Sequence, residues 1–150
     1  MSTDPSHQRF PPELPEDNKR VLRILWVAFI ATQGVFATIY SMLAETLEAD
    51  PEQGVLMLPI FAGIALLMAG ISLFALPTYA ARASVDYRSA CIFRFATAES
   101  IGIFGLVLGM LGLEGYPFGF FTAAALVLLI QAPSETDYQR YRKTWSGRQP

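Results

Sequence analysis

The sequence predicts an all-α membrane protein, a bundle of four transmembrane helices with both ends of the chain in the cytoplasm. Of the 150 residues, 53% are hydrophobic and only 16% are charged, a composition unlike that of ordinary soluble domains. Four apolar runs, at residues 21–43, 55–79, 91–113 and 116–132, are joined by short polar connections. Lysine and arginine are absent from the connections at 46–54 and 114–115. Because these residues mark the cytoplasmic side, the two connections are expected outside the cell.

The first 20 residues are expected to be a disordered cytoplasmic tail. They contain four prolines among acidic and polar residues, and such a composition buries too little apolar surface to offset the entropy of ordering. The tail is too long and too acidic to begin a signal peptide, so the first span is expected to stay uncleaved.

The first span, residues 21–43, follows Lys19, Arg20 and Arg23, whose long side chains can reach the lipid headgroups. Gln33 lies about 18 Å along this helix, close to the middle of the bilayer. An amide at that depth must form a hydrogen bond. Two alternatives stay open: Gln33 clamps one helix to another, or it contributes to a polar site around an ionised residue.

The second span, residues 55–79, is rich in glycine and alanine, which suits close approach of another helix. Pro59 falls in its first turn, where the missing N–H is harmless. Pro77, near the other end, is expected to bend or end the helix. Ser72 lies at a depth similar to that of the acidic residue in the third span.

The third span, residues 91–113, carries one carboxylate, Glu99, well inside an apolar run. A charge at such depth costs roughly 2.5–3.5 kcal/mol on insertion scales, so it normally faces a partner or a wet cavity. Glu99 is therefore the main candidate for a functional residue. Arg94, five residues earlier, is not on the same face as Glu99 and is expected to extend toward the cytoplasm.

Small residues recur along the third span at spacings of four, three, four and three. We call them the glycine face: Ala98, Gly102, Gly105, Gly109 and Gly112. A face of this kind packs against another helix, either in the same chain or in a neighbouring one.

The fourth span, residues 116–132, is stopped by Pro133, and the remaining residues, 133–150, form a basic amphipathic tail. Ser134 followed by Asp137 resembles a capping box and predicts a new helix that begins near Ser134. Aromatic residues of this helix share one face and basic residues fill much of the rest, which predicts contact with anionic lipid headgroups at the cytoplasmic interface. The expected lipid-interface residues are Tyr138, Arg140, Tyr141, Arg142, Lys143 and Trp145. Because this patch adjoins a membrane span, no nucleic-acid partner is expected.

Residues 96–108, ATAESIGIFGLVL, resemble the carboxylate-bearing helix of subunit c, the proteolipid rotor subunit of rotary ATP synthases. The second and third spans and their basic connection look like the hairpin of that subunit. The resemblance implies that Glu99 binds a proton or a sodium ion. It covers about a third of the chain, which lacks a GxGxGxG run in its second span and has two further spans. The chain is also similar to a family of small bacterial four-span membrane proteins without an assigned activity.

Two functions are expected from these features. The first is a non-enzymatic integral membrane protein that self-associates, or joins a membrane complex, through the glycine face, with Glu99 as a buried structural carboxylate. The alternative is a subunit that binds or translocates protons or sodium ions at Glu99, with Gln33, Ser72 and Thr97 as further ligands.

We expect no enzymatic activity, because no nucleophile, base or metal constellation is evident. No cofactor or metal is expected other than H⁺ or Na⁺ at Glu99. The single cysteine, Cys91, cannot form a disulfide within the chain, and a small buried side chain is its expected role. The concentration of basic residues on one side favours the inner membrane of a bacterium.

Overall fold

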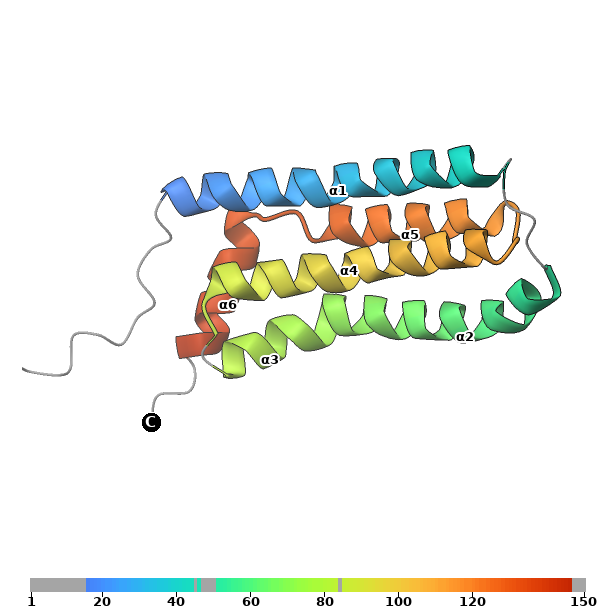
Figure 1. The fold of residues 1–150 in the computed structure, drawn as a ribbon. Helices are drawn as coiled ribbons and strands as arrows, with labels where there is room; N and C mark the ends of the chain where they lie inside the picture. The colour runs from blue at the N-terminus through green and yellow to red at the C-terminus, as the bar shows by residue number, and fades with distance from the viewer. Residues whose placement is uncertain (1–15, 45, 47–50, 84, 147–150) are drawn as a thin grey trace, which may run out of the picture.

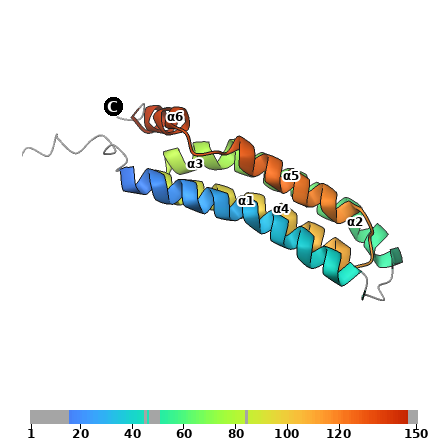
Figure 2. The ribbon, with the colours of Figure 1, turned by 90° about the horizontal axis from the view of Figure 1, so that it is seen from above.

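The chain folds into long helices that run along a common axis, with one short helix across an end of the bundle (Figures 1 and 2). The computed structural model describes residues 16–44, 46, 51–83 and 85–146, without the side chains of residues 51, 82 and 144–146. The helices are α1 (Glu16–Ala44), α2 (Pro51–Gly70), the π-helical turn η2 (Ile71–Ala75), α3 (Leu76–Arg82), α4 (Tyr87–Met110), α5 (Tyr116–Ile130) and α6 (Glu135–Ser146). The described part of the chain has no strand, which confirms the all-α prediction.

Three helices are long and apolar enough to cross a membrane: α1, the continuous rod formed by α2, η2 and α3, and α4. A fourth candidate combines α5 with α6, which are bent by 70° at their junction. The structure thus supports an integral membrane protein with three to four spans. Alone, the 15 residues of α5 rise by only about 22 Å.

Helix α4 is the centre of the bundle, since it packs against α1, α5 and α2. Helices α1 and α5 also pack against each other, whereas α2 is packed chiefly on α4. Figure 1 accordingly shows α2 at the edge of the bundle, beside α4. Only 11% of the apolar window of the α2 rod is buried, compared with 44% for α4. Most of the α2 surface is therefore available to lipid or to another protein.

The two ends of α4 are fixed by capping. At its start the Asp86 carboxylate accepts a hydrogen bond from the Ser89 N–H at 2.9 Å, so the helix begins four residues before the predicted span. At its end the N–H of Leu113 bonds to the carbonyl of Leu108, and that of Gly112 to the carbonyl of Gly109. This pair of bonds is a Schellman motif, which needs a residue with positive φ. Gly112 supplies it with φ 84°.

Pro77 does not end its helix, which continues to Arg82. Instead, the π-helical turn η2 precedes the proline, and the Leu76 N–H bonds to the carbonyl of Ile71, five residues back. A proline inside a regular α-helix clashes with the carbonyl four residues earlier, which is here that of Leu73. The Leu73 carbonyl lies within the wider π turn, which leaves room for the proline ring. The helix therefore continues beyond Pro77.

Helix α1 begins at Glu16, inside the segment that we expected to be a disordered tail. Glu16 and Asp17 lie in its first turn, where the helix dipole favours negative charge. Lys19 pairs with Glu16 at 3.0 Å and with Glu135 of α6 at 3.1 Å. The rest of the predicted tail, residues 1–15, lies outside the described residues.

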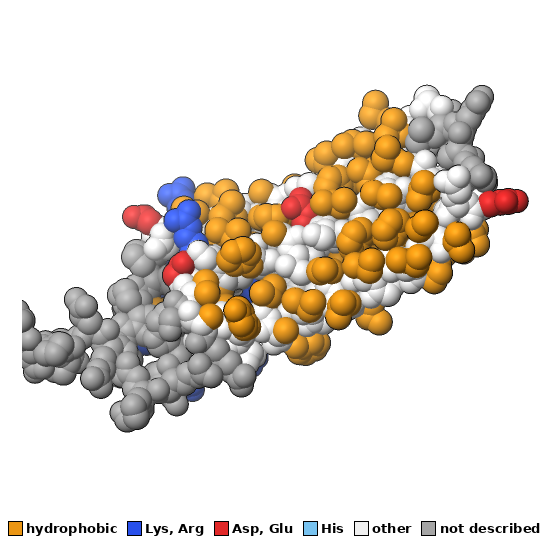
Figure 3. All heavy atoms as spheres, turned by 60° about the horizontal axis from the view of Figure 1, so that its bottom comes forward, with side chains coloured by type: hydrophobic (Ala, Val, Ile, Leu, Met, Phe, Trp, Pro, Cys, Tyr) orange, Lys and Arg blue, Asp and Glu red, His pale blue; other side chains and the backbone are white. Residues whose placement is uncertain are grey.

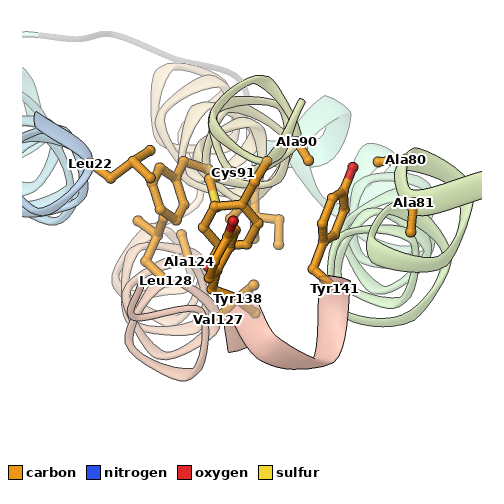
Figure 4. Packing of buried hydrophobic residues seen from close by; sticks show 14 of the residues in the cluster. Leu22, Ala80, Ala81, Ala90, Cys91, Ala124, Val127, Leu128, Tyr138 and Tyr141 are labelled. Atoms are coloured by element: carbon orange, nitrogen blue, oxygen red, sulfur yellow. The ribbon is translucent and has the colours of Figure 1, made fainter. Parts of the chain in front are cut away.

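Tyrosines fill the core at the end of the bundle where α4 begins and α6 lies, which we call the basic end. The ring of Tyr87 meets those of Tyr138 and Tyr141 edge to face, with centroids 5.1 and 5.3 Å away. Figure 4 shows Tyr138 and Tyr141 projecting from α6 toward Cys91 on α4 and the alanines of α3. Aromatic packing therefore holds α6 against the ends of the long helices.

Candidate functional site

Glu99 lies in the middle of α4 and is half-buried. On the face drawn in Figure 3, hydrophobic side chains cover the length of the bundle and an acidic side chain interrupts them midway. Phe93 and Ile103 of the same helix are 59% and 44% exposed. The half-buried Glu99 between them therefore lies partly on an apolar surface, and not wholly inside the bundle.

The Thr32 hydroxyl of α1 lies near the Glu99 carboxyl. This hydroxyl donates to the carbonyl of Ala28 at 3.0 Å. A threonine has one hydroxyl proton, so at any moment it can donate either to Ala28 or to a charged Glu99, but not to both. We call the line of contact at Thr32 and Glu99 the α1–α4 seam.

Gln33, the residue after Thr32, is buried between α1 and α4, with 4% of its surface exposed. Its amide oxygen lies close against Gly102, because a Cβ added there would be 2.0 Å from it. Neither amide atom has a hydrogen-bond partner within the described part of the chain. Gln33 therefore lies near the seam but forms no bond that would clamp the two helices.

The other two expected ligands of an ion are bonded elsewhere. Ser72 is fully buried on the π turn, donates to the carbonyl of Arg94 at 2.8 Å and accepts from the side chain of Gln131 at 2.6 Å. Thr97 donates to the carbonyl of Phe93 at 2.7 Å. In the described part of the chain, neither hydroxyl is therefore bonded to Glu99.

The glycine face packs inside the chain. Gly102, Gly105 and Gly109 are buried, and side chains at these positions would collide with Gln33 of α1, with Phe120 of α5 and with Tyr40 of α1 respectively. Ala98 is fully buried in the core. Gly112 is not on the helix at all, since it forms the turn after α4.

A polar cluster at the basic end was not expected from the sequence. Arg94 donates to the Oδ2 atom of Asp137 at 2.7 Å, and the Tyr87 hydroxyl donates to the same oxygen at 3.1 Å. Arg94 is 8% exposed, so this is a largely buried ion pair between α4 and α6. The available signal was an arginine at the start of a span and an aspartate in a predicted cap, both on the side that we expected to be cytoplasmic.

The helix that we expected at Ser134 is present, since the Asp137 N–H bonds to the Ser134 hydroxyl at 3.1 Å and α6 begins at Glu135. Its two tyrosines are placed differently from our expectation. Tyr138 and Tyr141 are buried at 4% and 7% exposure, because they pack on Tyr87 within the core and not on a surface facing lipid.

The basic residues of α6 lie nearer to the surface. Arg140 and Lys143 are exposed and Arg142 is half-buried, so lipid contact by these three residues stays a prediction. The Trp145 side chain lies outside the described set.

Among the described residues, no group of three or more His, Cys, Asp and Glu side chains is placed to hold a metal ion. No family model matches the chain, and searches among curated proteins and solved structures find no similar protein.

Proposed function

We propose that this chain is a non-enzymatic subunit of a membrane assembly and that it meets its neighbour along the α1–α4 seam. The observation that carries the proposal is the half-buried Glu99 in the middle of α4, on a helix with exposed hydrophobic side chains on either side of it. Leaving a charged carboxylate next to lipid costs roughly 2.5–3.5 kcal/mol. A neighbouring helix that covers Glu99 and supplies a hydrogen bond reduces this cost.

The seam takes the place of the glycine face as the proposed contact surface. Gly102, Gly105 and Gly109 are already covered by α1 and α5 of the same chain. The glycine face thus brings α1 and α5 close to α4 and leaves Glu99 at its edge. Either a second copy of this chain or a different membrane protein would satisfy the proposal.

Disulfide crosslinking in membranes tests the case of self-association. Val35 and Ile103 are suitable positions, being 53% and 44% exposed and one helical turn beyond Thr32 and Glu99. Each is changed to Cys in a Cys91→Ala background, and Leu126→Cys on α5, 54% exposed in the native chain, is the matched control. We expect crosslinked dimers from Val35→Cys and Ile103→Cys only. Equal crosslinking at all three positions contradicts a specific seam.

If no position crosslinks, the neighbour is a different protein or none. Purification from membranes with the native chain and with Glu99→Leu then separates these cases. A protein that co-purifies with the native chain and is lost with Glu99→Leu supports the proposal. Loss of that protein with Leu126→Ala as well contradicts it.

A second candidate function is proton exchange at Glu99. The position of Glu99 favours it, because a half-buried carboxyl on an apolar helix is partly accessible and is costly to keep charged. Sodium is less favoured than in our expectation from the sequence, since Ser72 and Thr97 are bonded elsewhere.

Carbodiimide labelling of membranes across a range of pH tests this candidate, with the adduct located by mass spectrometry and Glu99→Gln as the control. Labelling at Glu99 that fades as the pH rises supports an exchanging proton. Labelling that is absent at every pH contradicts it.

We further propose that both ends of the chain lie in the cytoplasm of a bacterium, with four spans, and that α6 lies at the inner membrane interface. The distribution of charge supports this arrangement. Basic side chains visible in Figure 3 gather toward one end of the molecule, and α1, α4 and α6 each contribute to that end. Anionic lipid headgroups attract such a surface.

A further inference from the structure

A small cavity lies at the basic end, beside α3, α4 and α6. Its volume is about 80 Å³, several times the space that one water molecule needs. It is lined by Pro77, Thr78, Arg94, Asp137, Arg140 and Tyr141. Two guanidinium groups and one carboxylate give this lining a net charge of +1.

Arg94 has donor capacity that the described residues do not use. One terminal nitrogen of its guanidinium donates to Asp137 at 2.7 Å. The Nε atom is buried and has no hydrogen-bond partner in the described part of the chain. Because an unpaired buried donor on a charged group is costly, an acceptor in the cavity that the guanidinium turned to meet would stabilise it.

The carboxylate in the lining is less repulsive to an anion than its charge suggests. The Oδ2 atom of Asp137 accepts from both Arg94 and Tyr87, so its charge is shared with two donors. Arg140, on the next turn of α6, brings a second guanidinium to the same cavity. Two arginines around one small space match the geometry of a phosphate, which they hold through several oxygens at once.

We propose that this cavity binds a phosphate group, supplied by the headgroup of an anionic phospholipid or by free phosphate. Arg94 binds it from the interior side through its unused Nε–H, and Arg140 binds it from the surface side. The ion pair with Asp137 keeps Arg94 in place. The site does not depend on Glu99 or on the α1–α4 seam, and it differs from a general attraction of basic residues to a membrane because it includes a buried arginine.

Binding to the full chain in maltoside micelles tests the proposal by titration calorimetry. The two probes are inorganic phosphate and short-chain phosphatidylglycerol. We expect Arg140→Gln to weaken binding of the effective probe about tenfold, which corresponds to one charge-assisted hydrogen bond. Lys143→Gln is the matched control, because it removes one charge from the same helix at a residue outside the cavity lining. It is expected to weaken binding less than twofold.

Arg94→Lys adds a test of the buried donor, since lysine keeps a charge for Asp137 but has no Nε–H. We expect a loss of about tenfold here as well. If Arg94→Lys does not fold, the comparison of Arg140→Gln with Lys143→Gln still tests the proposal. If only phosphatidylglycerol binds, the ligand is a lipid headgroup. If inorganic phosphate and phosphatidylglycerol both bind, the site recognises the phosphate group whatever carries it. The proposal is overturned if neither probe binds, or if Arg140→Gln and Lys143→Gln weaken binding equally.

Discussion

The ion pair between Arg94 and Asp137 joins residues for which the sequence indicated separate roles. Arg94 was expected to extend from the third span toward the cytoplasm, and Asp137 to cap the last helix. The structure places the Arg94 side chain toward that same end but fixes it on Asp137 at 2.7 Å. Sequence spacing predicts which residues of one helix are neighbours. It gives no distance between residues of two helices, and so the pair could not be predicted.

Removing one partner of this pair is expected to destabilise the protein. Arg94→Met leaves Asp137 without its cation, and we expect the free energy of unfolding to fall by about 3 kcal/mol. Unfolding in mixed detergent micelles, followed by circular dichroism, measures the change. The double variant Arg94→Met, Asp137→Leu is expected to be more stable than Arg94→Met alone. If the two single changes simply add, the residues are not coupled.

Gly105 is expected to be the glycine least tolerant of substitution on the glycine face. A Cβ there would lie 2.6 Å from the Cβ of Phe120 and 3.0 Å from the carbonyl oxygen of Pro117. These atoms are rigid, so Gly105→Ala should destabilise the protein by about 1–3 kcal/mol. Gly63→Ala on α2 is the control, because nothing lies within 4 Å of its added methyl group. The same unfolding measurement should show Gly63→Ala unchanged or slightly more stable. Equal losses in both variants contradict this account.

For single residues, the sequence predicted those features that depend only on neighbouring residues in the chain. The cap at Ser134 was predicted and is confirmed by its bond from Asp137. Glu99 was correctly singled out as the carboxylate within a span. Its place at the edge of the bundle, and the bonding of Ser72 to Gln131, depend on how the helices are rotated against one another. Apolar periodicity does not define that rotation in a chain whose helices are hydrophobic on every side.

At the level of the helices, hydropathy predicted the apolar cores well and the ends less well. The predicted third span began at residue 91, whereas α4 begins at Tyr87. The extension contains Tyr87 and Arg88, whose polar groups lower the hydropathy without opposing a helix. The π turn before Pro77 also escaped prediction, because the sequence marks the proline but not how the backbone accommodates it.

The cap at Asp86 provides a prediction about pH. The hydrogen bonds from Ser89 hold the pKa of Asp86 below its ordinary value of 3.8. Since the pKa is lower in the folded state, the cap stabilises α4 above about pH 4, and this contribution is lost as the pH falls through the folded pKa. Asp86→Ala should cost about 1 kcal/mol at neutral pH.

Unfolding measured at several pH values checks this prediction. The difference between the native chain and Asp86→Ala should shrink below pH 4. Asp86→Asn serves as the control, because an amide caps the helix without titrating. A difference that persists unchanged at pH 3 means that the carboxylate charge does not contribute.

On the scale of the whole molecule, α5 raises a question of length. A rise of about 22 Å is less than the hydrocarbon thickness of about 30 Å, and α6 turns away by 70° instead of extending it. Thinning of the bilayer around a short span has a modest cost. Four spans with α6 along the interface are therefore compatible with this geometry.

Labelling of single cysteines determines the arrangement. In a Cys91→Ala background, Ala83→Cys, Glu114→Cys and Lys143→Cys each lie at an exposed position. A maleimide that cannot cross membranes should label Glu114→Cys in intact cells, and the other two only in inverted vesicles. Labelling of Glu114→Cys and Lys143→Cys from the same side would mean that α5 does not cross the membrane.

The overall class of the molecule was the easiest property to predict, because composition and the length of apolar runs are enough for it. The choice of neighbour for each helix was not predictable. Gly102 and Gly105 suggested close contact, but only the structure shows that α1 and α5 of the same chain provide it. A small-residue face fits many helices equally well, and the one that covers it is decided by the whole fold.

The ion pair across α4 and α6 also has a consequence for how the chain is made. Asp137 follows Arg94 by 43 residues, and ribosomes add about 5–20 residues per second. For roughly 2 to 9 s, each new chain therefore holds a third span whose arginine has no acidic partner from α6. The charge of Arg94 is thus compensated by Asp137 only after α6 has been made.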